Sequence, residues 1–189
     1  MKLSISNRAN LPTKFGMFHV QAFTEHHKEH LVIMTPQLAC TTPLVRVHSE
    51  CLTGDTLGSL KCDCGEQLSL ALQTIAAQGC GMVIYLRQEG RGIGLFNKIN
   101  AYHLQDQGLD TVQANHQLGF ADDERNFDIV STILDYYGIT HIRLMTNNPK
   151  KLEEIRGVTI SERIPLIIPA NPHNENYLKI KQEKSGHLF

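Results

Sequence analysis

Hydrophobic and polar positions over the first 50 residues alternate in short segments that are separated by polar turns. Short segments of this kind are typical of β-strands. They predict strands at residues 15–23, 31–35 and 44–48. The polar turn at 24–29 would allow the first two strands to pair with each other.

From Glu66 onward the period changes, and Leu68, Leu72 and Ile75 fall on one helical face that ends at Gly79. Beyond this helix, strands are predicted at 82–86 and 141–145, and helices at 95–104, 127–137 and 150–156. Strands that alternate with helices indicate parallel pairing. We therefore predict an α/β fold, a layered single domain over residues 1–189 with a mixed, partly parallel sheet flanked by helices.

Three polar loops, at 50–65, 88–94 and 146–151, each follow a predicted strand directly. The carboxyl ends of neighbouring strands meet at one edge of an open α/β sheet, and ligands usually bind there. The sequence therefore predicts one functional site that is built from these three loops.

Composition limits the possible partners. The chain has 189 residues, of which 41% are hydrophobic, and its 18 basic and 19 acidic residues give a net charge of -1. Such a balance provides no overall field for nucleic acid or an anionic membrane. The N-terminus has no long apolar stretch and so no signal peptide, and the longest apolar runs are strand-sized. A soluble cytoplasmic protein is expected.

The five cysteines are odd in number and three of them are crowded. This usage favours metal binding and free thiols in a reducing compartment over a disulfide framework. Cys40 and Cys80 lie outside the crowded group and are interpreted as small structural residues.

Cys51, Cys62 and Cys64 have spacing that suits zinc, because one short loop supplies three thiolates. Three ligands are one short of a closed tetrahedron, which favours a catalytic ion that keeps a position for water or substrate. A structural site completed by His48 is the alternative. Lys61 is the only cation adjacent to these cysteines in the sequence.

Other motifs are ambiguous when each is taken alone. Residues 87–94 combine three glycines with two arginines and could cradle phosphate, or could simply connect a strand to a helix. Residues 146–151 could form an anion site at a helix start, or an ordinary cap with solvated lysines. The acidic run 122–124 could complement a helix dipole, and Arg125 could pair with it.

Taken together, the motifs closely resemble the GTP cyclohydrolase II family, in the family's own order. The matching segments are Arg46-Val-His-Ser-Glu-Cys-Leu-Thr-Gly-Asp, Lys61-Cys-Asp-Cys-Gly, Arg87-Gln-Glu-Gly-Arg-Gly-Ile-Gly-Leu, Ala114-Asn-His-Gln-Leu-Gly-Phe and Thr146-Asn-Asn-Pro-Lys-Lys. The likeness runs from Leu11 to Leu188. It leaves no segment for a dihydroxybutanone phosphate synthase domain, so the single-function form is expected.

This resemblance implies a zinc- and magnesium-dependent hydrolase that acts on GTP in riboflavin biosynthesis. The implied products are 2,5-diamino-6-(5-phosphoribosylamino)pyrimidin-4(3H)-one, formate and pyrophosphate. Cys51, Cys62 and Cys64 would hold one zinc ion per chain, and a water in the fourth position would attack C8 of the guanine. The resemblance also suggests a homodimer.

By the same resemblance, Arg125 is a nucleophile toward the α-phosphate, Asp123 is its proton acceptor and Tyr102 is an active-site tyrosine. A guanidinium has no free lone pair at neutral pH, so Arg125 could instead stabilise phosphoryl charge while water attacks. A carboxylate such as Glu89 can accept both guanine N1–H and the exocyclic amine. The implied substrate-binding residues are Arg46, Val47, His48, Ser49, Glu50, Gln67, Glu89, Gly90, Arg91, Thr111, Thr146 and Lys151.

Two other functions fit part of the sequence. A GTP hydrolase could stop before formate release, although the intact cysteines and Tyr102 argue against this. A zinc-stabilised binding module for nucleic acid is disfavoured by the near-neutral charge and by an aromatic content of only 6%.

Overall fold

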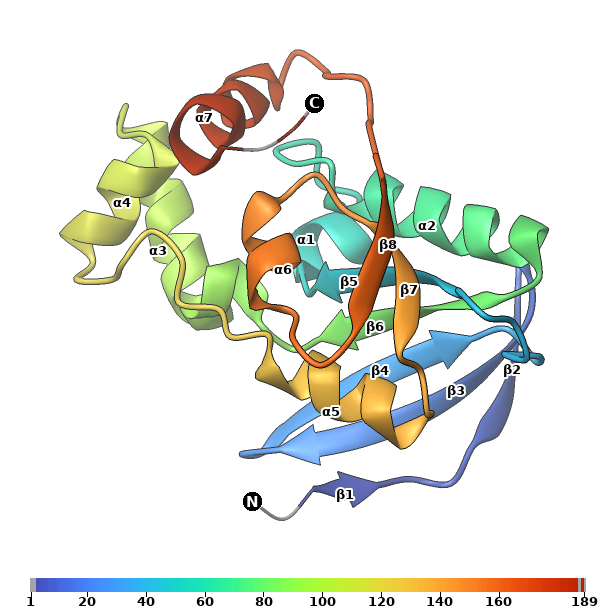
Figure 1. Cartoon of the computed structure of the whole chain (residues 1–189). Coiled ribbons are helices and arrows are strands. Elements are labelled where there is room, and N and C mark those ends of the chain that lie inside the picture. Colours follow the sequence, from blue (N-terminus) through green and yellow to red (C-terminus); the bar gives the residue numbers. More distant parts are fainter. Residues whose placement is uncertain (1–2, 187, 189) are drawn as a thin grey trace.

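The centre of the computed structural model, which describes residues 3–186 and 188, is one eight-stranded sheet (Figure 1). The strands run in the order β1-β3-β4-β6-β5-β7-β8, and β2 also pairs with β3. Their bounds are β1 Ser4–Ile5, β2 Ala9–Thr13, β3 Gly16–Glu25, β4 Lys28–Met34, β5 Leu44–Ser49, β6 Gly81–Leu86, β7 His141–Met145 and β8 Thr159–Ile164.

Pairing changes from antiparallel to parallel at the middle of the sheet. The strands from β1 to β4 pair antiparallel, and β4 pairs antiparallel with β6. From β6 onward, β5, β7 and β8 pair parallel. The predicted mixed, partly parallel sheet is therefore confirmed, as is the predicted hairpin between the strands now labelled β3 and β4.

Helices cover both faces of the sheet (Figure 1). The apolar side of α5 packs in one core with Val45 and Val47, whereas α2 packs in a second core with Leu44. Their bounds, with those of the other helices, are α1 Leu52–Asp55, α2 Cys64–Gln78, the 3-10 helix η1 Glu89–Gly92, α3 Gly94–Asp106, α4 Thr111–Gln117, α5 Asp128–Tyr136, α6 Pro149–Glu154 and α7 Glu175–Ser185.

Alternation along β5 decides which side chains reach the α2 side of the sheet. Val45 and Val47 both point into the core under α5. Because successive strand residues face opposite sides of the sheet, the residues next to them face the α2 side. Arg46 points the other way and reaches Gln67 of α2, with 2.6 Å between Arg46 Nη2 and Gln67 Oε1. His48, two positions on, lies on the same side as Arg46 and contacts Asp55.

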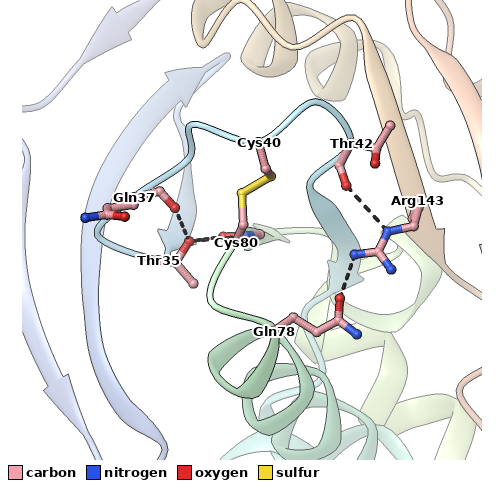
Figure 2. Close-up of a disulfide and its surroundings, with 8 residues drawn as sticks. Thr35, Gln37, Cys40, Thr42, Gln78, Cys80 and Arg143 are labelled. Atoms are coloured by element: carbon pink, nitrogen blue, oxygen red, sulfur yellow. Dashed lines mark hydrogen bonds between the residues drawn. A yellow bond between two sulfur atoms is a disulfide. The ribbon is translucent and has the colours of Figure 1, made fainter.

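The expectation that Cys40 and Cys80 are unpaired was wrong, because they form a disulfide (Figure 2). Cys40 lies shortly before β5 and Cys80 directly before β6. These strands are parallel neighbours whose first residues, Leu44 and Gly81, are paired. The two cysteines are therefore brought to a Cα–Cα distance of 6.5 Å, although 40 residues separate them. Spacing alone could not reveal this, since the contact depends on strand order.

Several elements went unpredicted because their patterns are weak. Strand β8 and helix α7 are largely polar, and β1 and β2 form an exposed edge. Helix α4 did carry a signal, because Asp110 and Gln113 form a capping box at its start. Among the described residues, no helix is long and apolar enough to cross a membrane.

Candidate functional site

A cavity of about 330 Å³ opens beyond the carboxyl ends of β5, β6 and β7, where the three predicted loops meet. Its walls include most of the residues that the sequence predicted: Arg46, His48, Ser49, Glu50, Cys51, Cys62, Cys64, Gln67, Glu89, Gly90, Arg91, Tyr102, Thr111, Arg125, Thr146 and Lys151. A cavity of this size is typical of small-molecule sites.

Two predicted residues do not line the cavity. The side chain of Val47 is buried in the core under α5, and only its carbonyl faces the site, where it accepts a 2.7 Å hydrogen bond from Lys151. Asp123 lies behind Arg125 and contacts the cavity through that side chain. Each of them therefore contacts a residue of the cavity wall, Lys151 for Val47 and Arg125 for Asp123.

The three crowded cysteines meet at one point. Cys51 precedes α1, Cys62 lies in the loop that follows, and Cys64 begins α2. Their sulfur atoms lie within 4.8 Å of one another. The alternative with His48 as a fourth ligand is not supported, because His48 Nε2 lies 3.1 Å from Asp55 Oδ1 and this cluster contains no histidine.

Two glycines allow the cysteines to converge. A Cβ at Gly54 would lie 2.8 Å from the sulfur of Cys62 and 3.2 Å from that of Cys51. A Cβ at Gly65 would lie 2.3 Å from the carbonyl oxygen of Gly54, so α1 and the start of α2 pack backbone against backbone. The resulting cradle of three soft donors fits a zinc ion.

Gly54→Ala is expected to destroy zinc binding, because its methyl group would occupy the space between the sulfur atoms. Metal analysis after zinc loading would measure the loss. Gly58→Ala is the control, since a Cβ at Gly58 meets no atom within 4 Å and only its φ of +67° disfavours alanine. Gly54→Ala protein that retains the zinc content of the unmodified chain would contradict this packing account.

Lys98 is a buried cation beside the cysteines that the sequence did not reveal. Its Nζ lies 3.1 Å from the sulfur of Cys51, 2.7 Å from Glu89 Oε1 and 3.0 Å from Thr53 Oγ1. Burial opposes its charge, but the hydrogen bond to Glu89 and the charge of Cys51 raise the pKa of Lys98 above its usual value. Lys61, the sequence candidate, instead pairs with Asp106.

The acceptor atoms of Glu89 are already engaged. Its Oε2 accepts a 2.6 Å hydrogen bond from the backbone of Leu52, and its Oε1 accepts from Lys98 and from the backbone of Gly90. Glu89 therefore joins the loop after β6 to the cysteine loop. Any ligand contact would have to use the lone pairs that these donors leave free.

Asp55 organises the turn that carries Cys51. It accepts a 2.9 Å hydrogen bond from the backbone of Cys51 and a 2.7 Å bond from the hydroxyl of Tyr85, besides its contact with His48. Burial lowers the pKa of His48 although Asp55 opposes this, so the ring is held neutral. Sequence reasoning had not singled out Asp55.

Positive side chains gather in the cavity without equal negative charge. Arg46 and Lys151 are both buried, and Lys151 forms no ion pair with any described residue. Burial lowers the pKa of Arg46 to about 10, and its Nε has no hydrogen-bond partner among residues 3–186 and 188. Burial, followed by the charges of Arg46 and Arg125, lowers the pKa of Lys151 well below its usual value. An anionic ligand would relieve this repulsion.

Binding of a polyanion should therefore be coupled to proton uptake by Lys151. A bound polyanion favours the protonated amine and so raises the pKa of Lys151. At a pH between the pKa of Lys151 in the free protein and its pKa in the complex, binding takes up a proton, and the affinity for the polyanion increases as the pH falls. The neighbouring charges that set this balance are Arg46, Arg125, Asp123 and Lys181.

Titration calorimetry with inorganic triphosphate, in buffers of different ionisation enthalpy, measures this uptake directly. Lys151→Met should remove the proton uptake that Lys151 contributes. The uptake measured with this variant includes the protons that triphosphate itself binds, and it is subtracted from the uptake of the unmodified protein. Equal uptake by both proteins would exclude Lys151 as the source.

Arg125 is held in one orientation by Asp123. The carboxylate accepts from Arg125 Nε at 2.8 Å and from Nη2 at 2.6 Å, while Nη1 points toward Ser49 at 3.3 Å from its hydroxyl oxygen. Burial favours the neutral acid, but the hydrogen bonds and charge of Arg125 hold the pKa of Asp123 below its usual range. The pair is therefore a fixed guanidinium with an ionised partner.

Tyr102 lies across the cavity on α3. Its hydroxyl is 3.4 Å from Thr53 Oγ1, and the ammonium groups of Lys61 and Lys98 lie 5.0 Å and 5.6 Å from its ring centroid. Burial raises the pKa of Tyr102 to about 12, so the phenol stays protonated and can donate. Thr111 reaches the cavity from the first turn of α4, which Asp110 caps.

The chain is similar to the members of one known family over nearly its whole length. The family described as GTP cyclohydrolase II matches residues 4–165. A GTP cyclohydrolase-2 of Campylobacter hominis is 59% identical over 100% of this chain and 97% of its own length. One from Helicobacter pylori is 57% identical over 100% of this chain and 99% of its own, and one from Helicobacter hepaticus is 56% identical over the full length of both.

A solved structure with a similar fold is a two-domain 3,4-dihydroxy-2-butanone 4-phosphate synthase from A. baumannii. It matches with a TM-score of 0.50 and 15% sequence identity, over 88% of this chain and 40% of that protein. At this identity the likeness concerns the fold alone.

Proposed function

Because the chain belongs to the GTP cyclohydrolase II family of hydrolases, which act on GTP in riboflavin biosynthesis, we propose the full reaction of that family for it. The products would be 2,5-diamino-6-(5-phosphoribosylamino)pyrimidin-4(3H)-one, formate and pyrophosphate. The observation that carries this proposal is the meeting of three thiols and a cluster of cations in one cavity. Ring opening and phosphate release both have candidate groups there.

Cys51, Cys62 and Cys64 are the proposed zinc ligands. The cradle around Gly54 and the convergence of three sulfur atoms support this assignment. When bound, zinc supplies a Lewis acid at the wall of the cavity. Three thiolates would weaken that acidity, and the ammonium of Lys98 against Cys51 offsets part of their charge.

The triphosphate is proposed to bind at the buried cations. Among the described residues, neither Arg46 nor Lys151 forms an ion pair with a carboxylate, and bound phosphates would favour the protonated form of Lys151. Arg125 directs one nitrogen past Asp123 toward Ser49. We propose that Arg125 stabilises charge on the α-phosphoryl group and that Asp123 orients it. The ionised state of Asp123 supports orientation over acceptance of a proton from a guanidinium.

Tyr102 is proposed to donate a hydrogen bond or a proton during ring opening, since its phenol stays protonated in this environment. The remaining wall residues are proposed to bind substrate: His48, Ser49, Glu50, Gln67, Glu89, Gly90, Arg91, Thr111 and Thr146, with Val47 acting through its backbone. Glu89 can recognise guanine only with the lone pairs that Leu52, Gly90 and Lys98 leave free.

We propose that Mg²⁺ accompanies the triphosphate, that the enzyme acts in the cytoplasm, and that residues 1–189 form one domain. Neither nucleic acid nor a membrane is a proposed partner, because the net charge of -1 offers no general attraction to them.

A homodimer is proposed as well. Leu95, Phe96 and Ile99 project from one side of α3 with exposed fractions of 40%, 79% and 49%. Phe96→Glu should shift the mass measured by light scattering toward the monomer, whereas Met17→Glu, on the distant strand β3, should leave it unchanged. A monomeric unmodified chain would refute the dimer.

Mass spectrometry of the nucleotide product tests the proposed function. Zinc-loaded protein with GTP and Mg²⁺ should yield the ring-opened, monophosphorylated product, and ATP should not be consumed at a comparable rate. A product that retains C8 would favour the shorter reaction, in which hydrolysis stops before formate leaves.

A further inference from the structure

The C-terminal helix α7 contributes to the cavity wall, although it falls beyond residue 165, where the family match ends. Tyr177, Ile180 and Lys181 of α7 line the cavity, as does His173 just before it. Positions three and four apart share one face of a helix. A helix without an apolar stripe thus presents one face to the cavity.

Lys181 fastens this helix to the cysteine loop. Its Nζ lies 3.2 Å from Oδ1 of Asp63, the residue between Cys62 and Cys64. The other oxygen of Asp63 accepts a 2.5 Å hydrogen bond from Gln67, whose own oxygen accepts from Arg46. A continuous chain of polar contacts therefore runs from α7 through the turn between the two cysteines to β5.

Leu188, which follows α7 in the chain, contacts a different wall of the same cavity. The backbone N–H of Leu188 donates a 2.8 Å hydrogen bond to the carbonyl of Asn147. Asn147 belongs to the loop after β7 and lines the cavity. Contacts of α7 and of Leu188 thus reach both the cysteine loop and the loop that carries Thr146 and Lys151.

The Lys181 contact is buried. Lys181 is 9% exposed and Asp63 is 1% exposed, and the ring centroid of Tyr177 lies 4.4 Å from Lys181 Nζ. A charge removed from water is stable only when it is paired, so this arrangement requires both partners. Asp63, held from both sides, has little freedom to move the cysteines that flank it.

We propose that Lys181 is a positioning residue: through Asp63 it holds the turn from Cys62 to Cys64, and it keeps α7 closed as a wall of the nucleotide cavity. The identity of the nucleotide rests on the proposed function. The tether, which is the ion pair between Lys181 and Asp63, does not rest on that function, because it is defined by contacts within this chain. Lys181 needs no contact with the reacting atoms for this role.

The test compares Lys181→Met, Lys181→Arg and Lys179→Met in the full-length, zinc-loaded protein. Lys179 is the matched control, since it lies on the same helix but is 68% exposed, and its ion pair in the described part of the chain is with Glu183, four residues on. Amide hydrogen exchange of residues 61–67 and of α7, without nucleotide, reports on the tether. The KM for GTP and the ratio of formate to pyrophosphate report on its effect in turnover.

Lys181→Met should speed exchange in both segments, raise KM and lower the formate-to-pyrophosphate ratio by about tenfold, the usual effect of losing a group that orients metal ligands. Lys181→Arg should restore most of the ratio because it keeps the charge, and Lys179→Met should match the unmodified protein. Unchanged exchange at 61–67 together with an unchanged ratio in Lys181→Met would overturn the proposal.

If Lys181→Met fails to fold, Tyr177→Leu removes the ring beside the ammonium while sparing the ion pair. It should give the same pattern at smaller size, and unchanged exchange would again overturn the proposal. If the unmodified protein consumes no GTP, the proposed function fails, whereas the exchange data still decide whether Lys181 holds the turn.

Discussion

Replacement of Arg125 by alanine is expected to abolish pyrophosphate release, with a loss of about 10³-fold or more, while zinc content stays unchanged. The guanidinium donates two hydrogen bonds to Asp123, and its remaining nitrogen, Nη1, points toward the hydroxyl of Ser49 at the wall of the cavity. Alanine removes the charge that would balance the α-phosphoryl group, but it should spare the metal, because the described hydrogen bonds of the Arg125 side chain go to Asp123 and Ser49 and not to the cysteines.

Arg125→Lys separates the two mechanisms. If Arg125 stabilises charge, lysine should retain part of the activity, because a point cation can still offset phosphoryl charge. If Arg125 is a nucleophile, a GMP adduct on its side chain should form and decay at the turnover rate, and lysine should fail. Rapid quench with α-labelled GTP and peptide mass mapping detects the adduct. Full activity in Arg125→Ala would end both accounts.

Conversion of Cys51, Cys62 or Cys64 to serine should reduce the zinc content from about one ion per chain to near zero, because two sulfur ligands seldom retain a zinc ion. Formate release should vanish in each variant. Pyrophosphate release should survive in part, since Arg125 and Asp123 do not contact the cysteine cluster in the described contacts.

A double variant, Cys40→Ser with Cys80→Ser, is the matched control for these serine variants. It removes two sulfurs from the chain but none from the cavity, because this pair forms a disulfide between the loops that precede β5 and β6. It should keep both zinc and formate release. Stoichiometric zinc in all three single-serine variants would refute the assignment of the ligands.

The sequence predicted those parts of the fold that bury long apolar runs. Strand β6 was recognised because nearly all of its residues are buried, and α5 because its inward face is strongly apolar. The loops after β5, β6 and β7 were expected to meet, and they share one cavity. Strand β8 and helix α7 were not predicted because few of their side chains are apolar, so that neither segment has a clear hydrophobic pattern.

Side chains that depend on tertiary contacts could not be predicted. Nothing in the local pattern of α3 distinguishes Lys98, buried against Cys51 and Glu89, from a solvated lysine. Lys181 is equally hidden, because its partner Asp63 is 118 residues away in the chain. Val47 shows a related limit, since a motif match cannot tell that its side chain faces the core and leaves only its backbone for a ligand.

The central claim is that one cavity both opens the guanine ring and releases pyrophosphate. Incubation of zinc-loaded protein with Mg²⁺ and GTP labelled with ¹³C at C8 tests it most directly. The account predicts that the label appears in free formate, in step with an equal amount of pyrophosphate. Label that remains in the nucleotide while pyrophosphate accumulates would contradict it.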